Sequence, residues 1–192
     1  GVRVPPGAAV DFPKVMERMR RLRSAISPND SVHRFKKLGV DVFLGEAKFV
    51  GPDAVEAAGK RLRFSKAVIA TGARAARLPI PGLWESGGLT NETVFSLTEL
   101  PKRLLVIGAG PIGVELAQSF ARFGSRVILF EAMHGILPRE DADASELIRK
   151  ALDRDQVDFL CCVDIELVER QGMESVVRFK SKHGRSGESV FD

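Results

Sequence analysis

The 192-residue chain is poor in the residues that mark several protein classes. It contains no tyrosine, one tryptophan and only two cysteines, Cys161 and Cys162, which are adjacent. Two neighbouring cysteines do not form a disulfide framework, and by themselves they do not supply the four ligands of a structural zinc site. We therefore expect a reducing, cytoplasmic setting, no metal site, and two cysteines that pack as inert core residues.

Long apolar runs are also missing. No segment approaches the roughly 20 apolar residues of a membrane-spanning helix, and the N-terminal residues 1–6 lack the apolar stretch of a signal peptide. These absences predict a protein that is neither embedded in a membrane nor secreted.

Positive charge is concentrated in one segment. The net charge is +4, but residues 14–37 carry eight Lys and Arg against two acidic residues. A nucleic-acid-binding protein combines such a patch with a recognisable motif, and this segment has none. We interpret it as a solvated helix face, and expect neither nucleic acid nor a membrane surface as a partner.

The first half of the chain reads as helices followed by short strands. Asp11 is placed to cap a helix that ends at Ser27-Pro28, with an apolar stripe at helical spacing formed by Val15, Met19, Leu22 and Ile26. A second helix is predicted over 31–38, and its C-terminal stop is Gly39. Four strands are predicted next, over 40–44, 54–57, 61–64 and 67–70, the last continuously apolar as if covered on both faces.

The second half alternates strands and helices. Residues 78–100 read as a connection in which Trp84 packs against an interface. Strands over 104–107, 126–130 and 157–162 then alternate with helices over 111–123 and 142–152, which predicts a parallel sheet with right-handed crossovers. Residues 164–169, 175–180 and 188–191 follow as an antiparallel meander. The predicted class is α/β, with a Rossmann-like domain.

A glycine-rich loop is the strongest signal in the chain. The motif GxGxxG follows a predicted strand and opens a helix, as a dinucleotide-binding loop requires; it comprises Gly108, Ala109, Gly110, Pro111, Ile112 and Gly113. The first glycine permits a tight turn, the second lets a pyrophosphate approach the backbone, and the third lets the helix pack closely on the strand. Free N–H groups and the helix dipole then hold the phosphates.

Glu131 ends the next strand, where a carboxylate accepts hydrogen bonds from ribose hydroxyls. A 2′-phosphate would meet a negative charge there, so NAD(H) is favoured over NADP(H). His134 and Arg139 lie in the following loop, and either is an alternative partner for such a phosphate.

These residues, in order, resemble the pyridine nucleotide–disulfide oxidoreductases, and within them the mercuric reductase-like and dihydrolipoamide dehydrogenase-like branch. The resemblance rests on an ordered set of stretches: 43–49, 68–73, 79–82, 100–103 leading into the glycine loop, and 136–141. It implies a two-dinucleotide-binding-domain flavoprotein, with part of an FAD-binding domain over 1–90 and an NAD(P)-binding domain over 91–192 that lacks its final strand.

The resemblance also implies roles for single residues. Gly45 and Ala47 correspond to a segment that meets the FAD adenine, and Thr71 and Gly72 to an Ala-Thr-Gly turn beside the FAD. Glu115 corresponds to a catalytic-site glutamate that faces the nicotinamide and pairs with a lysine near the flavin. A plainer interpretation is that this carboxylate complements the helix dipole. Ile165 weakly matches a position that lines the NAD adenine, although core packing explains it equally well.

The resemblance implies that the chain is an internal piece of a longer enzyme. The first FAD loop and a C-x-x-x-x-C redox pair are expected upstream, and a second FAD motif and a dimerisation domain downstream, in a homodimeric parent. The expected reaction is hydride transfer from NAD(P)H, preferably NADH, to FAD and on to a disulfide or a metal ion. The alternative is a non-catalytic NAD(H)-binding module, such as a redox sensor.

Overall fold

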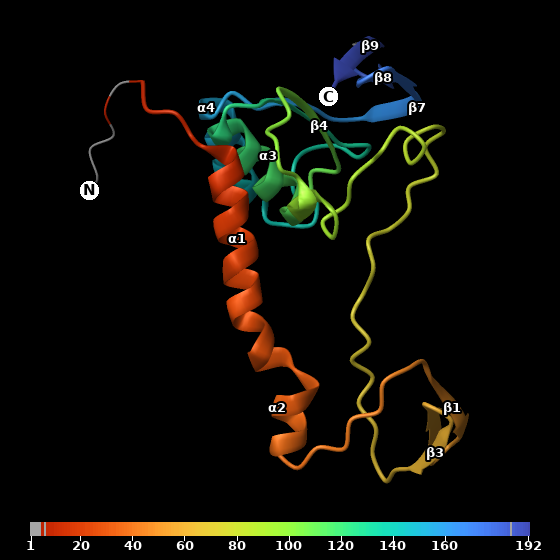
Figure 1. Ribbon diagram of the computed structural model, residues 1–192. Helices are drawn as coiled ribbons and strands as arrows, with labels where there is room; N and C mark the ends of the chain where they lie inside the picture. The colour runs from red at the N-terminus through yellow and green to blue at the C-terminus, as the bar shows by residue number, and fades with distance from the viewer. Residues whose placement is uncertain (1–4, 6, 185) are drawn as a thin grey trace. The chain divides into compact units, whose positions relative to one another are not determined.

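A computed structural model describes residue 5, residues 7–184 and residues 186–192. The chain divides into two compact units (Figure 1). One unit combines the residues up to Glu17 with Ala75–Asp192, and the other comprises Arg18–Arg74. Among the described residues, no helix has both the length and the apolar character needed to cross a membrane.

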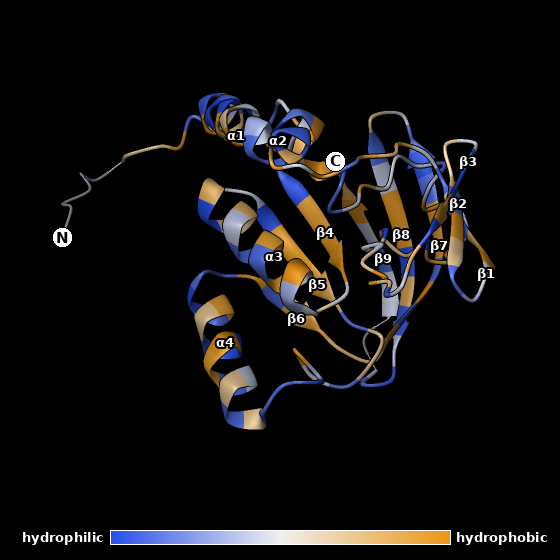
Figure 2. Cartoon of the chain, turned by 90° about the horizontal axis from the view of Figure 1, so that it is seen from below, coloured by the Kyte–Doolittle hydropathy of each residue, from blue (hydrophilic) through white to orange (hydrophobic). Residues whose placement is uncertain are grey.

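A parallel sheet forms the centre of the larger unit. Its strands are β4 (Arg103–Ile107), β5 (Arg126–Phe130) and β6 (Asp158–Leu160), in the order β4-β5-β6. Two helices connect them, α3 (Pro111–Phe123) and α4 (Ala142–Arg154). Figure 2 shows both helices on one side of these apolar strands. The predicted strand–helix alternation is therefore confirmed.

An antiparallel meander covers the other side of the parallel sheet (Figure 2). It consists of β7 (Val163–Gln171), β8 (Glu174–Ser181) and β9 (Ser186–Phe191), paired in that order. Phe130 of β5 packs on Phe179 of β8 with ring centroids 4.7 Å apart, and Leu160 and Val163 join the same buried cluster. The predicted meander is therefore confirmed. The buried contact of Phe130 with Phe179 joins the two sheets.

One boundary in this unit differs from the prediction. The strand expected over 157–162 ends at Leu160, and both cysteines that follow are half-buried rather than core. Cys162 has a left-handed backbone with φ 54°, which a strand does not tolerate. The strand was predicted to be too long because the residues stay apolar past Leu160, and hydropathy gives no sign of the turn in the backbone.

Helix α1 (Phe12–Ile26) begins as predicted, since the Asp11 side chain accepts a hydrogen bond from the Lys14 N–H. Its predicted buried stripe is partly wrong. Phe12 and Met16 are the buried residues, whereas Leu22 and Ile26 are 46% and 56% exposed. The reason is that α1 is covered only near its start, where the Phe12 ring meets two aromatic rings of α3.

The smaller unit begins with the rest of α1, the short 3₁₀ helix η1 (Ser27–Asp30) and α2 (Val32–Lys37). Ser31 caps α2 by accepting the Arg34 N–H at 3.2 Å. The eight basic side chains of residues 14–37 are exposed, in agreement with a solvated helix face. An antiparallel sheet follows, made of β1 (Ala47–Gly51), β2 (Ala54–Ala57) and β3 (Lys60–Arg63).

Two predicted strands do not form. Residues 40–44 are irregular, and β1 forms a few residues later in their place. Residues 67–70 are also irregular, and Val68 is 91% exposed. A strand needs hydrogen-bonded neighbours, and these two segments pair with no other strand in the part of the chain that the structure describes.

Residues 78–100, predicted as a connection, are largely irregular. They contain one short 3₁₀ helix, η2 (Val94–Ser96). Trp84 is half-buried, and its indole N–H donates to the Leu78 carbonyl at 2.9 Å. The tryptophan therefore packs against its own loop.

Candidate functional site

The glycine loop lies between the end of β4 and the start of α3, at the carboxyl edge of the parallel sheet. Gly108 has φ 103°, and its N–H donates to the Phe130 carbonyl at 2.7 Å. This bond holds the loop to the neighbouring strand β5. The tight turn expected at Gly108 is thus present.

Gly113 shows why helix α3 comes so close to the loop. A Cβ at this position would lie 1.9 Å from the Gly108 carbonyl oxygen, a backbone atom that has no freedom to move aside. Any side chain here would push α3 away from β4. The close packing expected of the third glycine is confirmed.

The N-terminus of α3 offers unpaired backbone donors. Gly110 is its N-cap and Pro111 its first residue, and no side chain caps the helix. A Cβ at Gly110 would meet no atom within 4 Å, so the space outside the loop is open. Open space against uncapped N–H groups is what a pyrophosphate needs.

Glu131 is bonded to the glycine loop. Its carboxylate accepts the Ala109 N–H at 2.7 Å and the Met133 N–H at 2.9 Å. The loop that follows folds back as well, because the Leu137 N–H donates to the Ala109 carbonyl. Two backbone donors leave lone pairs on this half-buried carboxylate for further hydrogen bonds. The structure therefore brings together the glycine motif and its predicted acidic residue.

The two predicted alternatives for a 2′-phosphate lie in the loop after Glu131. Arg139 is exposed. The Nδ1 atom of His134 lies 3.9 Å from the Cys161 sulfur and 3.8 Å from that of Cys162. This neighbourhood links His134 to the cysteines, a grouping that the sequence reasoning missed because the residues are 27 and 28 positions apart.

Glu115 lies in the second turn of α3. The helix begins at Pro111, so Glu115 is its fifth residue, and the first turn holds no acidic side chain. The helix dipole falls off beyond the first turn, so its interaction with this carboxylate is weak. The side chain is exposed, which leaves it free to face a ligand. Ile165 packs against both core clusters of the larger unit, so core packing is its role here.

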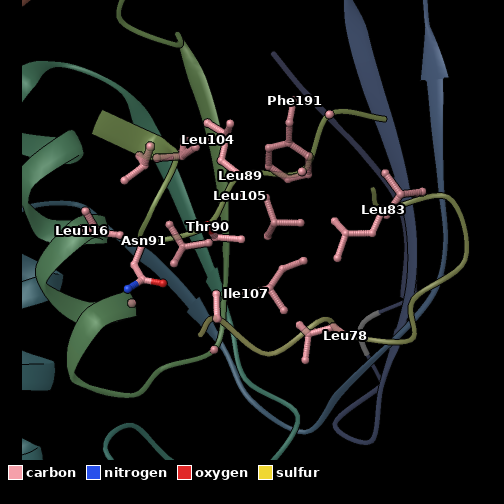
Figure 3. Close-up of a pocket in the computed structure, with 18 of the residues that line it drawn as sticks. Leu78, Leu83, Leu89, Thr90, Asn91, Leu104, Leu105, Ile107, Leu116 and Phe191 are labelled. Carbon is pink, nitrogen blue, oxygen red and sulfur yellow. The ribbon is translucent and has the colours of Figure 1, made fainter. Parts of the chain in front are cut away.

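A cavity of about 520 Å³ lies beside the glycine loop (Figure 3). Four consecutive residues of β4, Leu104–Ile107, line it together with apolar side chains of the connection such as Leu78 and Leu83. Consecutive strand residues point to opposite faces, so a cavity that touches all four runs along the strand edge. Among the described strands, β4 ends the sheet order, and this is its open edge. The lining also includes Gly108, Gly110 and Gly113, so the cavity extends from the strand edge to the glycine loop.

The residues predicted to meet FAD belong to the smaller unit. Gly45 precedes β1, and Ala47 begins it, paired with Ala57 of β2. Thr71 and Gly72 are exposed in an irregular stretch, where Gly72 has φ 67°. The structure thus places the four residues in two separate stretches of exposed backbone.

Comparison with known proteins gives consistent matches over most of the chain. The sequence profile of the family described as pyridine nucleotide-disulphide oxidoreductase matches residues 7–191. A mercuric reductase of Bacillus cereus is 34% identical over 85% of this chain and 26% of its own length. A dihydrolipoyl dehydrogenase of Acholeplasma laidlawii is 32% identical over 88% of this chain and 51% of its own length.

A solved structure agrees with these sequence matches. The HOCl-induced flavoprotein disulfide reductase RclA of Escherichia coli superposes with a TM-score of 0.79 and 31% identity, over 95% of this chain and 41% of that one. The chain spans between about a quarter and a half of the lengths of these relatives.

Proposed function

Because this chain belongs to the pyridine nucleotide-disulphide oxidoreductase family, we propose that its larger unit binds the nicotinamide dinucleotide of a flavoenzyme. The observation that carries the proposal is the joined geometry of the glycine loop. Gly113 admits α3 against the Gly108 carbonyl, and Glu131 holds the Ala109 N–H of the same loop. Together they leave uncapped helix donors facing open space beside a carboxylate.

NADH is the preferred ligand in this proposal. Glu131 offers acceptors to the ribose hydroxyls and repels a phosphate on the 2′ oxygen. His134 and Arg139 are the two candidate partners of a 2′-phosphate. His134 lies beside two thiols, so the exposed Arg139 is the one that competes with Glu131. One arginine on a surface loop offsets a half-buried carboxylate poorly, because its attraction is screened by solvent.

The chemistry belongs to the cofactors. When bound, reduced nicotinamide supplies a hydride to FAD, and the protein contributes binding and orientation. In this proposal the loop 108–113 holds the pyrophosphate, Glu131 the ribose, and Glu115 lies toward the nicotinamide end. Gly45, Ala47, Thr71 and Gly72 contact the FAD, whose main loop belongs to the longer protein.

The terminal acceptor is a disulfide or a metal ion. The names of the relatives support both classes, since one is a mercuric reductase and another a disulfide reductase. We further propose that residues 1–90 belong to the FAD-binding domain and 91–192 to the NAD(P)-binding domain of a homodimeric enzyme.

The test is a calorimetric titration of the chain with NADH and with NADPH. We expect tighter binding of NADH. Gly110→Ala adds a methyl group to the space proposed for the pyrophosphate and should weaken NADH binding at least tenfold. Its free energy of unfolding should change by less than about 1 kcal/mol, since the new Cβ touches nothing and the change is confined to the N-cap.

A matched control is Gly51→Ala in β1, where the added Cβ makes ordinary contacts. It should alter neither NADH binding nor stability. Wild-type affinity in Gly110→Ala, or no binding of either nucleotide by a cooperatively folded chain, would refute the proposed site. Glu131→Gln tests the preference: removal of the charge should narrow the gap between NADH and NADPH by about 1 kcal/mol. An unchanged gap would show that Glu131 does not select the nucleotide.

A further inference from the structure

Four potential metal ligands gather at one end of the larger unit. They are His134 in the loop after β5, Cys161 and Cys162 between β6 and β7, and His183 in the turn between β8 and β9. Their ligand atoms all lie within 4.8 Å of one another. The sequence contains two cysteines and three histidines, so the cluster holds both thiols and two of the three imidazoles.

Backbone hydrogen bonds bring the three segments together. The Cys162 N–H donates to the Met133 carbonyl at 3.1 Å, beside His134. The Lys182 N–H donates to the Cys162 carbonyl at 3.1 Å, beside His183. The Ser181 hydroxyl also donates to the Cys161 carbonyl. The cluster is thus a consequence of sheet pairing and does not depend on the chance position of long side chains.

The backbone of Cys162 explains how two adjacent thiols reach one point. Neighbouring residues of a strand face opposite sides, so adjacent cysteines in a strand do not normally share a ligand. Cys162 has φ 54°, a left-handed conformation that is unfavourable for a residue with a side chain. This turn breaks the alternation and places both sulfur atoms beside His134. Strain of this kind is often retained where it serves a site.

Two of the separations in the cluster are close to those of tetrahedral coordination. Zinc–sulfur bonds of about 2.3 Å and zinc–nitrogen bonds of about 2.0–2.1 Å put a sulfur and a nitrogen about 3.6 Å apart across a tetrahedron. The observed separations from His134 Nδ1 are 3.8 and 3.9 Å. Two thiolates with two imidazoles are a ligand set typical of structural zinc sites.

We propose that His134, Cys161, Cys162 and His183 form a closed tetrahedral site for a zinc ion. Binding of Zn²⁺ forms two zinc–sulfur and two zinc–nitrogen bonds and releases the proton of each thiol to solvent. The two histidines are exposed, which gives the ion a route of entry. All four ligands come from the protein, so the ion acts as a structural clamp between the loop after β5, the β6–β7 junction and the β8–β9 turn.

Burial raises the pKa of the Cys162 thiol, and its hydrogen bond with Cys161 acts in the same direction. Metal binding converts each thiol to a coordinated thiolate. The metal-bound and metal-free proteins should therefore differ in the Co²⁺ spectrum and in the access of a thiol reagent to the two cysteines.

The experiment uses the full 192-residue chain, reduced and freed of metal. Zn²⁺ is titrated against a chromophoric chelator, and Co²⁺ serves as a spectroscopic substitute. We expect one ion per chain, protection of both cysteines from a thiol reagent, and a Co²⁺ spectrum with strong visible d–d bands and sulfur charge-transfer bands. Loss of a residue that only hydrogen-bonds to a metal ligand typically weakens metal binding roughly 10–100-fold. Loss of one of the four ligands should weaken Zn²⁺ binding by at least that much.

The variants are Cys161→Ser, Cys162→Ser, His134→Ala and His183→Ala, each of which should weaken binding. The control is His33→Ala in α2, which lies outside the cluster and should bind as the wild type does. The Ser variants should melt cooperatively at the temperature of the metal-free wild type, so that weak binding is not mistaken for unfolding. Weak octahedral Co²⁺ bands, thiols that react equally with and without Zn²⁺, or binding that survives Cys161→Ser and Cys162→Ser together would each overturn the proposal.

Discussion

Two four-residue segments with the same apolar character adopt different structures in this molecule. Residues 127–130 and 67–70 are both continuously apolar. The first forms most of β5, in which Val127, Leu129 and Phe130 are at most 2% exposed. The second forms no regular structure, and its Val68 and Ile69 are 91% and 73% exposed. The difference shows that an apolar run is a requirement for a buried strand and does not guarantee one.

The neighbours of each segment account for the contrast. β5 has a parallel partner on each edge, β4 and β6, and layers on both faces. Each partner satisfies backbone N–H and C=O groups that burial would otherwise leave unpaired. In the part of the chain that the structure describes, residues 67–70 have no strand partner. Their apolar side chains therefore stay in solvent, where the backbone is satisfied by water.

The largest expected difference between the two segments is in hydrogen exchange. Amides of 127–130 should exchange only through global unfolding, which for a domain of this kind costs about 5–15 kcal/mol. Amides of 67–70 should exchange with almost no protection. Exchange monitored by mass spectrometry on peptides that cover each segment measures both values. Comparable protection of the two would mean that 67–70 is paired in solution.

Side-chain truncation should separate the segments next. Leu129→Ala removes a fully buried side chain and should reduce the free energy of unfolding by about 2–5 kcal/mol. Val68→Ala removes an exposed one and should change it by less than about 0.5 kcal/mol. Urea unfolding followed by circular dichroism provides both numbers. A loss above 1 kcal/mol in Val68→Ala would contradict the exposed position of this residue.

A smaller difference is expected between the ion pairs of the two units. Asp192 in the larger unit accepts the N–H groups of Lys102 and Arg103 as well as the Arg103 guanidinium. The hydrogen bond to Arg103 lowers the pKa of Asp192. In the smaller unit, Asp53 pairs with Arg63, whose side chain is 82% exposed. Asp192→Asn should cost about 1 kcal/mol at pH 7, and Asp53→Asn almost nothing.

The pH dependence follows from the sign of the shift. A carboxyl whose pKa is lowered by folding stabilises the protein above its ordinary value near 4 and loses that contribution as the pH falls through the folded pKa. The gap between wild type and Asp192→Asn should therefore close at acidic pH. Urea midpoints measured at pH 7 and near pH 3 test this. A gap that stays constant would show that the ionisation of Asp192 does not contribute to stability.

The larger unit was predictable because its signals are local. Gly108, Gly113 and Gly124 mark a turn, a close approach and the end of α3, and each effect depends on residues within a few positions. The ends of α3 and β5 were predicted to the residue. The glycine loop and Glu131 were found because they stand at the ends of consecutive strands, which meet at one edge of a parallel sheet.

The failures have a common origin in contacts between distant residues. The stripe on α1 was misplaced because the aromatic rings of α3, about a hundred residues away, decide which turn is covered. The strands predicted over 40–44 and 67–70 do not form. Each needed a neighbouring strand, and the part of the chain that the structure describes offers none. The Cys and His cluster was missed because its members are brought together by strand pairing and by one left-handed residue, Cys162.

Local features of the larger unit follow from short stretches of sequence: the cap at Asp11, the tight turns, the alternation of strands and helices, and the glycine loop with its acidic partner. These features depend on backbone sterics and on hydrogen bonds between near neighbours, which a short stretch of residues specifies. Contacts between distant segments decided which apolar runs became buried strands, which face of α1 was covered, and that two thiols and two imidazoles lie close together. Those outcomes require segments far apart in the chain to meet, and residue spacing does not encode which of the available partners each segment finds.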